Sequence, residues 1–171
     1  MTIRKILGNL KCKCYNKESM ALQMGGLIDE VDRALLEVVQ ADARLSFREI
    51  GRRIGMSTPA VAERIRRLEA GGVIRGYSAM VDRAALGRAI GAFVQLTVSD
   101  KDFQRVTGLC RSLDAVVECH HITGEDSFVI RLAVTSIAEL EDVISRFRKI
   151  GPASSSVILS SQVDGKPAAA R

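Results

Sequence analysis

The feature that most constrains this chain is a pair of short helical segments separated only by Gly55-Met56-Ser57. Ser46 and Glu49 form a capping box that starts the first segment, and Gly55 fits the left-handed conformation that ends a helix. Ser57 is a suitable N-cap for the second segment, which tolerates Pro59 in its first turn. Two short helices joined by a tight glycine-containing turn predict a helix-turn-helix.

A further helix precedes this pair. Apolar residues recur at helical spacing, and Asp29 can cap the helix while Asp32 adds favourable negative charge to its first turn. The apolar stripe consists of Ile28, Val31, Leu35 and Val38. After the third helix, residues 73–81 are expected to form a short extended segment, the wing of a winged helix-turn-helix. We place this three-helix domain at residues 27–81, after a flexible arm at residues 1–26.

The charge of the helical region favours a polyanionic partner. Between Arg44 and Arg75 there are eight arginines and three glutamates, in a chain of net charge +5. Arg64 and Arg67 lie one turn apart on the third helix, so one could take a guanine edge while the other takes a phosphate. Alternatively, they pair with Glu63 and Glu69 on an ordinary surface. The residues expected at DNA are Ser46, Ser57, Thr58, Pro59, Ala60, Glu63, Arg64, Arg67 and Arg75.

The C-terminal half alternates strands and helices in the order βαββαβ, which is the ferredoxin-like topology. Strands are expected at residues 93–98, 116–123, 127–134 and 156–163, and Ser136 with Glu139 forms a capping box for the second helix. The chain is therefore predicted to be α+β. This domain spans residues 91–163, between a linker at 82–90 and a tail at 164–171.

One face of the predicted sheet is only half polar. Its residues include Gln95, Thr97, Val129, Arg131 and Ala133. A face of this kind on so small a domain is usually covered, and a second copy of the domain is the simplest cover.

A second candidate site is the turn between two core strands. Asp126 could accept an ammonium group while the N–H groups of the turn hold a carboxylate, which would suit a free amino acid. A glycine beside two acids is also common in hairpins that bind nothing. The residues expected at an effector are His121, Thr123, Gly124, Glu125, Asp126 and Ser127. In Cys119-His120-His121, only the first and third side chains share a face, so the triplet cannot bind one metal together.

Other classes of function are not favoured. The sequence holds no phosphate loop, dinucleotide fingerprint or catalytic constellation, so no enzyme activity and no cofactor are expected. Cys12-Lys13-Cys14 has no further cysteine or histidine nearby to complete a metal site. No apolar run reaches the roughly 18 residues of a membrane span, and the apolar stretch near the N-terminus is too short for a secretory signal. We expect a cytoplasmic protein.

Several segments resemble the Lrp/AsnC (feast/famine) transcriptional regulators. The most specific is RIRRLEAGGVIRGYSAMVD, at residues 64–82, and HHITGEDSFVIRLAV resembles the family's segment around its effector loop. The resemblance covers roughly residues 27–163. It implies an amino-acid-responsive C-terminal domain, through which dimers form and often stack into higher oligomers, commonly octamers.

The resemblance also implies an effector site near the contacts between dimers, at the turn from Gly124 to Ser127. Asp126 matches the family's effector-loop aspartate, whereas Glu125 stands where the family often has an aromatic residue. Two alternatives remain open. One is a regulatory or enzymatic α+β domain whose helical N-terminus binds protein. The other is a chromatin-like DNA-binding protein without an effector.

Overall fold

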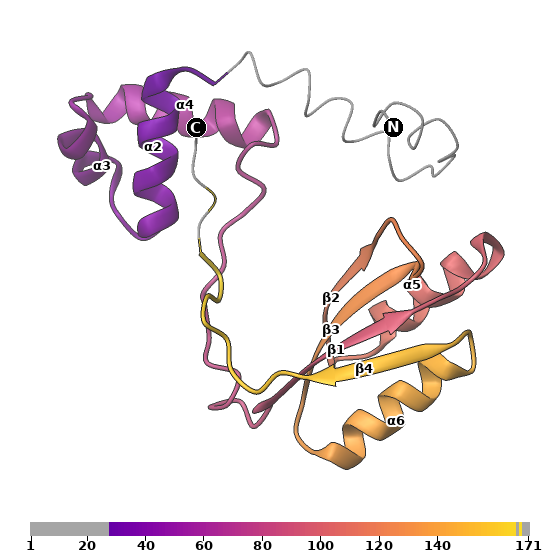
Figure 1. The fold of residues 1–171 in the computed structure, drawn as a ribbon. Coiled ribbons are helices and arrows are strands. Elements are labelled where there is room, and N and C mark those ends of the chain that lie inside the picture. Colours follow the sequence, from indigo (N-terminus) through magenta and orange to yellow (C-terminus); the bar gives the residue numbers. More distant parts are fainter. Residues whose placement is uncertain (1–27, 167, 169–171) are drawn as a thin grey trace. The chain divides into compact units, whose positions relative to one another are not determined.

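The computed structural model describes residues 28–166 and 168. The expected arm at residues 1–26, with Cys12 and Cys14, lies outside the described residues. The described chain divides into two compact units (Figure 1). The first contains the described residues up to Ser78 and from Gly165 onwards, and the second spans Ala79–Asp164.

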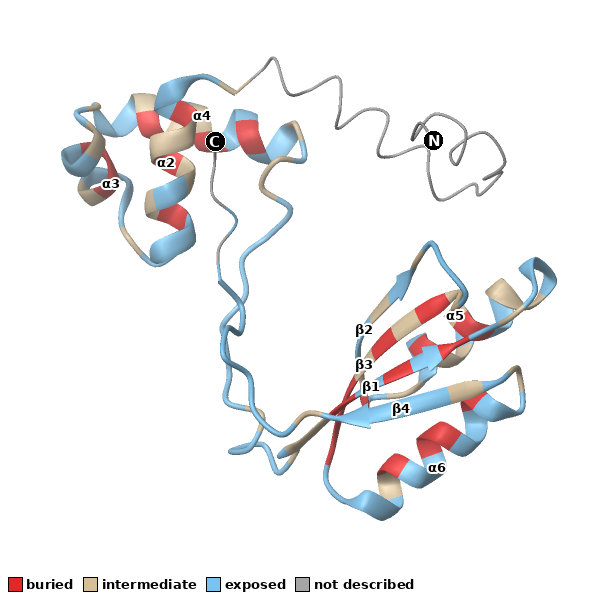
Figure 2. Cartoon of the chain, viewed as in Figure 1, coloured by how far each residue is buried: buried red, intermediate tan, exposed pale blue. Residues whose placement is uncertain are grey.

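The first unit contains three helices. They are α2 (Glu30–Ala41), α3 (Phe47–Ile54) and α4 (Thr58–Ala70). Asp29 caps α2 in a full capping box with Asp32. Ser46 accepts from the N–H of Glu49 at 3.2 Å, but the Glu49 carboxylate turns to arginines of α3, so only half of the predicted box forms. The buried faces of α2, α3 and α4 meet in one apolar core, and Figure 2 shows buried positions on all three helices. Its buried members are Leu35, Val39, Ile50, Val61, Ile65 and Leu68.

The buried face of α2 differs from the predicted stripe. Leu35 and Val39 are buried, whereas Val31 is exposed. Asp32 lies three residues before Leu35 and is itself buried, so a carboxylate occupies a position of the core-facing stripe.

The predicted wing is not a strand. Residues 71–89 contain turns and irregular chain, and the next strand begins only at Ile90. Val73 and Ile74 instead pack against the helical core, where their N–H groups donate to the Leu68 carbonyl at the end of α4.

The second unit is a four-stranded antiparallel sheet with two helices. Its elements are β1 (Ile90–Leu96), the 3-10 turn η5 (Asp100–Asp102), α5 (Phe103–Ser112), β2 (Val116–His121), β3 (Phe128–Val134), α6 (Ile137–Arg148) and β4 (Ala153–Val157). The strand order is β2-β3-β1-β4, and all three pairings are antiparallel. The predicted ferredoxin-like α+β fold is confirmed.

Both helices pack on the same face of this sheet. Val106 and Cys110 of α5 share one core with Phe147 of α6 and with alternate residues of β1 and β3. Ser136 caps α6 by accepting from the Glu139 N–H at 3.1 Å, while the Glu139 carboxylate accepts from Thr135 rather than completing the predicted box.

The last strand is shifted from its predicted position at residues 156–163. It begins at Ala153 and ends at Val157, because Gly151 allows the chain to pass closely against Thr97 and the Pro152 carbonyl accepts from the Thr97 N–H at 3.0 Å. Pairing with β1 therefore starts immediately after the turn, and Leu159 is left 97% exposed.

The other face of the sheet has no covering element in this unit. Phe93 and Gln95 of β1 project from it and are exposed, and Val129 of β3, which pairs with Gln95, is half-buried beside them. Arg131, on the neighbouring β3, forms ion pairs with Glu118 and Asp164.

Candidate DNA-binding surface and effector turn

The turn between α3 and α4 is built on two glycines. Gly55 adopts φ 72°, which ends α3 in the left-handed conformation predicted from the sequence. Gly51 lies inside α3, and a Cβ there would run into the carbonyl oxygen of Met56. The Met56 N–H donates to the Gly51 carbonyl at 2.8 Å, so the turn folds closely over this residue. The two glycines fix the angle between α3 and α4.

The N-terminal turn of α4 is open. Ser57, Thr58 and Pro59 are exposed, and Ala60 is half-buried. Ser57 is the N-cap residue, but its side chain makes no capping hydrogen bond. The start of α4 therefore presents small side chains and backbone N–H groups rather than a closed cap.

Arg64 and Arg67 do not form the surface pairs considered from the sequence. Arg64 Nη1 donates to Asp29 Oδ2 at 2.6 Å and to Asp32 Oδ1 at 2.7 Å, and its side chain is 24% exposed. Arg67 Nη2 donates to Asp32 Oδ2 at 2.5 Å, and its side chain remains 55% exposed. The hydrogen bond from Arg64 holds the pKa of the Asp29 carboxyl below its usual value. Both arginines tie α4 to the start of α2.

The two glutamates suggested as their partners bind elsewhere. Glu63 pairs with Arg66 at 2.5 Å, one turn along the surface of α4. Glu69 accepts a hydrogen bond at 2.9 Å from the hydroxyl of Tyr77, a residue that follows α4 in the chain. The alternative pairing of Arg64 and Arg67 with these glutamates is therefore wrong about the partners.

Further arginines project from α3. Arg52 and Arg53 both reach the Glu49 carboxylate, at 2.8 and 3.2 Å, and these contacts lower the Glu49 pKa to about 2. Arg48 and Arg75, outside this cluster, are exposed. The exposed surface of α3 and α4 thus carries an excess of positive charge.

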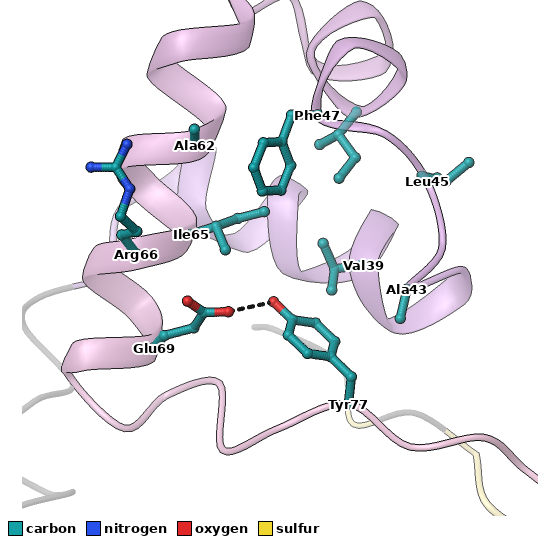
Figure 3. A pocket seen from close by; sticks show the side chains of 10 residues that line it. Val39, Ala43, Leu45, Phe47, Ala62, Ile65, Arg66, Glu69 and Tyr77 are labelled. Carbon is teal, nitrogen blue, oxygen red and sulfur yellow. Dashed lines mark hydrogen bonds between the residues drawn. The ribbon is translucent and has the colours of Figure 1, made fainter.

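The segment after α4 covers a hollow in the helical unit. The cavity measures about 250 Å³ and lies between α4, the start of α3 and the segment with Tyr77 that follows α4 (Figure 3). Phe47 and Ile65 form part of its apolar lining, and the Tyr77–Glu69 hydrogen bond crosses its mouth. Burial, together with Glu69, raises the pKa of the Tyr77 hydroxyl. Tyr77, within the segment expected to form the wing, therefore lines this hollow.

Hydrogen bonds join the β2–β3 turn to the end of β1. Asp126 Oδ1 accepts from Thr97 Oγ1 at 3.1 Å. The Ser127 hydroxyl donates to the Val98 carbonyl at 3.0 Å and accepts from the Val98 N–H at 3.1 Å. The Ser127 N–H donates to the Leu96 carbonyl at 2.9 Å, so this N–H is engaged within the fold and is not open to a ligand carboxylate.

The remaining residues of the β2–β3 turn are exposed beside Asp126. Thr123, Gly124 and Glu125 are exposed, and Gly124 adopts φ 135°, a conformation that strains any other residue. Asp126 is half-buried beside them, with one carboxylate oxygen bonded to Thr97.

His121 lies at the base of the same turn. Its ring packs edge-on against Phe103 at a centroid distance of 4.6 Å and lies 5.3 Å from Phe128. Cys119 packs against the core on the same side of β2, whereas His120 lies 3.5 Å from Glu118 on the other side. The predicted alternation of this triplet is therefore confirmed.

Two general observations concern the described part of the chain. Among residues 28–166 and 168, no three histidine, cysteine or acidic side chains are grouped to hold a metal ion. No helix in that part is long and apolar enough to span a membrane.

Comparison with known proteins matches both units. Residues 28–69 match the AsnC-type helix-turn-helix domain, and residues 91–167 match the Lrp/AsnC ligand binding domain. HTH-type transcriptional regulator LrpC from Bacillus subtilis is 33% identical over 139 residues, which cover 81% of this chain and 96% of LrpC. The chain belongs to the Lrp/AsnC family. Its relatives are named transcriptional regulators, so this Lrp/AsnC protein is a DNA-binding regulator rather than an enzyme.

Solved structures of the Lrp/AsnC family have the same fold. The structure of B. subtilis LrpC superposes with a TM-score of 0.76 and covers 81% of this chain and 98% of its own. The feast or famine regulatory protein from M. tuberculosis, solved in complex with L-methionine, is 32% identical with a TM-score of 0.77 and covers 83% and 99% of the two chains. E. coli AsnC is 26% identical, with a TM-score of 0.74, and covers 82% and 97%.

The residue that sequence reasoning missed is Asp32. The sequence predicts for it only a role in the charge of the first turn, but it is fully buried and hydrogen-bonded to both arginines. Its spacing from Leu35 and Val39 was the available signal, because all three residues fall on one face of α2.

Proposed function

We propose that this protein binds specific DNA sequences by placing α4 in the major groove. The observation that carries the proposal is the open first turn of α4, in which Thr58 and Pro59 are exposed beside a surface rich in arginine. In helix-turn-helix proteins, this end of the second helix meets base edges. We assign base contacts to Thr58 and Ala60.

The rest of the surface would bind the sugar–phosphate backbone. Arg67 keeps more than half of its side chain exposed and can reach a phosphate, and Arg75 lies just beyond α4. Ser46 and Ser57 place the N-termini of α3 and α4 at this surface, where their N–H groups favour anions. Glu63 is exposed on α4 and would repel a misplaced backbone.

Binding to two duplexes tests this proposal. One duplex is selected by the wild-type chain from a random-sequence pool, and the other is a scrambled version of the same length. Loss of one base contact in Thr58→Ala should reduce the preference for the selected duplex about tenfold, whereas Thr107→Ala on α5 should leave it unchanged. Equal wild-type affinity for both duplexes, falling steeply with salt, would instead indicate a chromatin-like protein.

We also propose that the β2–β3 turn binds an amino acid and that this binding alters assembly or DNA occupancy. The L-methionine complex of the M. tuberculosis relative supports an amino-acid effector. Asp126 offers a carboxylate for the ammonium group, with one oxygen already oriented by Thr97. The exposed residues Thr123, Gly124 and Glu125 surround it, with His121 and Ser127 at the base of the turn.

A thermal-shift screen of the amino acids, followed by calorimetry with each hit, tests the effector site. Asp126→Asn should abolish binding, because it removes the charge that pairs with the ammonium group. Thr97→Val is the matched control, since it removes only the hydrogen bond to Asp126 and should retain most of the binding. Unchanged binding by Asp126→Asn would remove Asp126 from the site.

Assembly would use the uncovered face of the sheet. We propose that a second copy covers Phe93 and Val129, and that such dimers associate further, to octamers, in the cytoplasm. A dimer interface of standard size would bury these apolar side chains. Phe93→Glu should therefore shift the protein to a smaller species in light scattering, and an unchanged mass would place the interface elsewhere.

A further inference from the structure

The helical unit contains a buried carboxylate that its apolar core does not require. Asp32 is fully buried, and it is the one charged side chain buried among the described residues. Removing a carboxylate from water is unfavourable unless charged partners compensate for the lost hydration. Asp32 has such partners for both oxygens: Oδ1 accepts from Arg64, and Oδ2 accepts from Arg67 and from the Asp29 N–H at 3.3 Å.

The two arginines use this carboxylate differently. Arg64 is held by two carboxylates through a single nitrogen, and three quarters of its side chain is covered. Arg67 gives one nitrogen to Asp32 and keeps the larger part of its side chain exposed. Arg64 therefore faces α2, while Arg67 is tethered at one side and open at the other.

We infer that Asp32 is a positioning residue for the DNA-binding helix. Through Arg64 it fixes how α4 is seated on α2, and through Arg67 it orients a guanidinium toward a DNA phosphate. Arg64 acts only through α2, whereas Arg67 touches the DNA. This inference rests on the proposed function, because it specifies how the same surface is oriented.

The charge of the cluster around Asp32 allows its positioning role to be distinguished from general electrostatic attraction to DNA. The cluster of Asp29, Asp32, Arg64 and Arg67 carries two negative and two positive charges. Asp32→Asn leaves it with a net positive charge, which by electrostatics alone strengthens binding to any duplex. The positioning role predicts the opposite for the selected duplex, because Arg64 and Arg67 lose their common anchor.

The experiment measures dissociation constants of the full chain for the selected and scrambled duplexes over a range of salt concentrations. Asp32→Asn should weaken binding to the selected duplex about tenfold or more without weakening binding to the scrambled one. Asp29→Asn is the matched control, since it removes the same charge from a half-exposed side chain and leaves the contacts of Asp32 with Arg64 and Arg67. Its preference for the selected duplex should stay within about threefold of wild type.

The arginines provide a second readout. Arg67→Ala should reduce the slope of log affinity against log salt by about one, because one phosphate contact is lost. Arg64→Lys keeps the charge but cannot bridge two carboxylates in the same way, so it should lower the affinity for the selected duplex at an unchanged slope. This variant also keeps the inference testable if Asp32→Asn does not fold.

The outcomes are distinct. Two results would overturn the positioning role and leave the proposed function standing. One is an equal loss of affinity for both duplexes in Asp32→Asn. The other is a salt slope reduced by about one in Arg64→Ala, as in Arg67→Ala. A wild-type chain that binds neither duplex would overturn the proposed function, and this inference with it.

Discussion

The two units of this protein are stabilised in different ways. The helical unit has a core of six buried apolar side chains and one buried carboxylate, and ion pairs join α2 to α4 across it. The second unit has a larger core of fourteen buried residues, none of them charged. Apolar cores tolerate exchanges between side chains of similar volume, whereas charge-assisted hydrogen bonds require particular atoms at defined distances. The unit that must present a defined surface to DNA thus contains the directional contacts.

The largest expected effect tests the apolar half of this comparison. Phe147 is fully buried between α6 and the sheet, so Phe147→Ala should destabilise the second unit by about 3–5 kcal/mol through lost burial and a cavity. Hydrogen–deuterium exchange, which reports each unit separately, should show faster exchange in β1 and β3. Unaltered exchange there would contradict the assignment of this core.

The next effect tests the close turn of the helical unit. Gly51→Ala should destabilise that unit by about 1–3 kcal/mol, because the new methyl group meets the Met56 carbonyl. Gly108→Ala on α5 is the matched control, since nothing lies near its added Cβ, and it should stabilise its helix by up to about 1 kcal/mol. Equal stability of wild type and Gly51→Ala in thermal unfolding would show that α3 and α4 do not meet as described.

Acid should weaken the charged contacts of the helical unit. The folded-state pKa values of Glu49 and Asp29 are lowered by arginines, so their contribution is complete above the unfolded-state values and is lost as the pH falls through the folded-state values. For Glu49 this window runs from 4.5 to about 2. Thermal unfolding of Glu49→Gln should show a smaller decrease in this window than wild type, and an identical decrease would remove Glu49 as a contributor.

The smallest effect concerns the chain that leaves α4. Tyr77→Phe keeps the ring over the cavity but removes the hydrogen bond to Glu69, which should cost about 0.5–1 kcal/mol of stability in this half-exposed position. Urea unfolding measures this difference. A larger loss, with faster exchange at the end of α4, would mean that Tyr77 holds α4 in place rather than only covering the hollow.

Local signals predicted most of the fold correctly. Caps and glycines are read from neighbouring residues, so Asp29, Ser46 and Gly55 lie where the sequence places them. The alternation of strands and helices likewise predicted the ferredoxin-like order, because each apolar period is a local property.

The errors concern contacts that depend on distant residues. The burial of Asp32 requires Arg64 and Arg67, which lie 32 and 35 residues further along the chain, and no periodicity of apolar residues reveals them. The limits of β4 depend on where Gly151 brings the chain beside Thr97, not on the valines and leucine that follow. The expected wing does not pair as a strand for a similar reason, since Val73 and Ile74 pack, partly buried, against the helical core.

The central claim is that the first turn of α4 meets DNA bases, and site-specific photo-cross-linking tests it most directly. A benzophenone side chain at position 58 should cross-link to the selected duplex, and one at position 137, where Ile137 is exposed on α6, should not. Cross-linking at position 137 with none at position 58, in a chain that retains its affinity, would contradict the account.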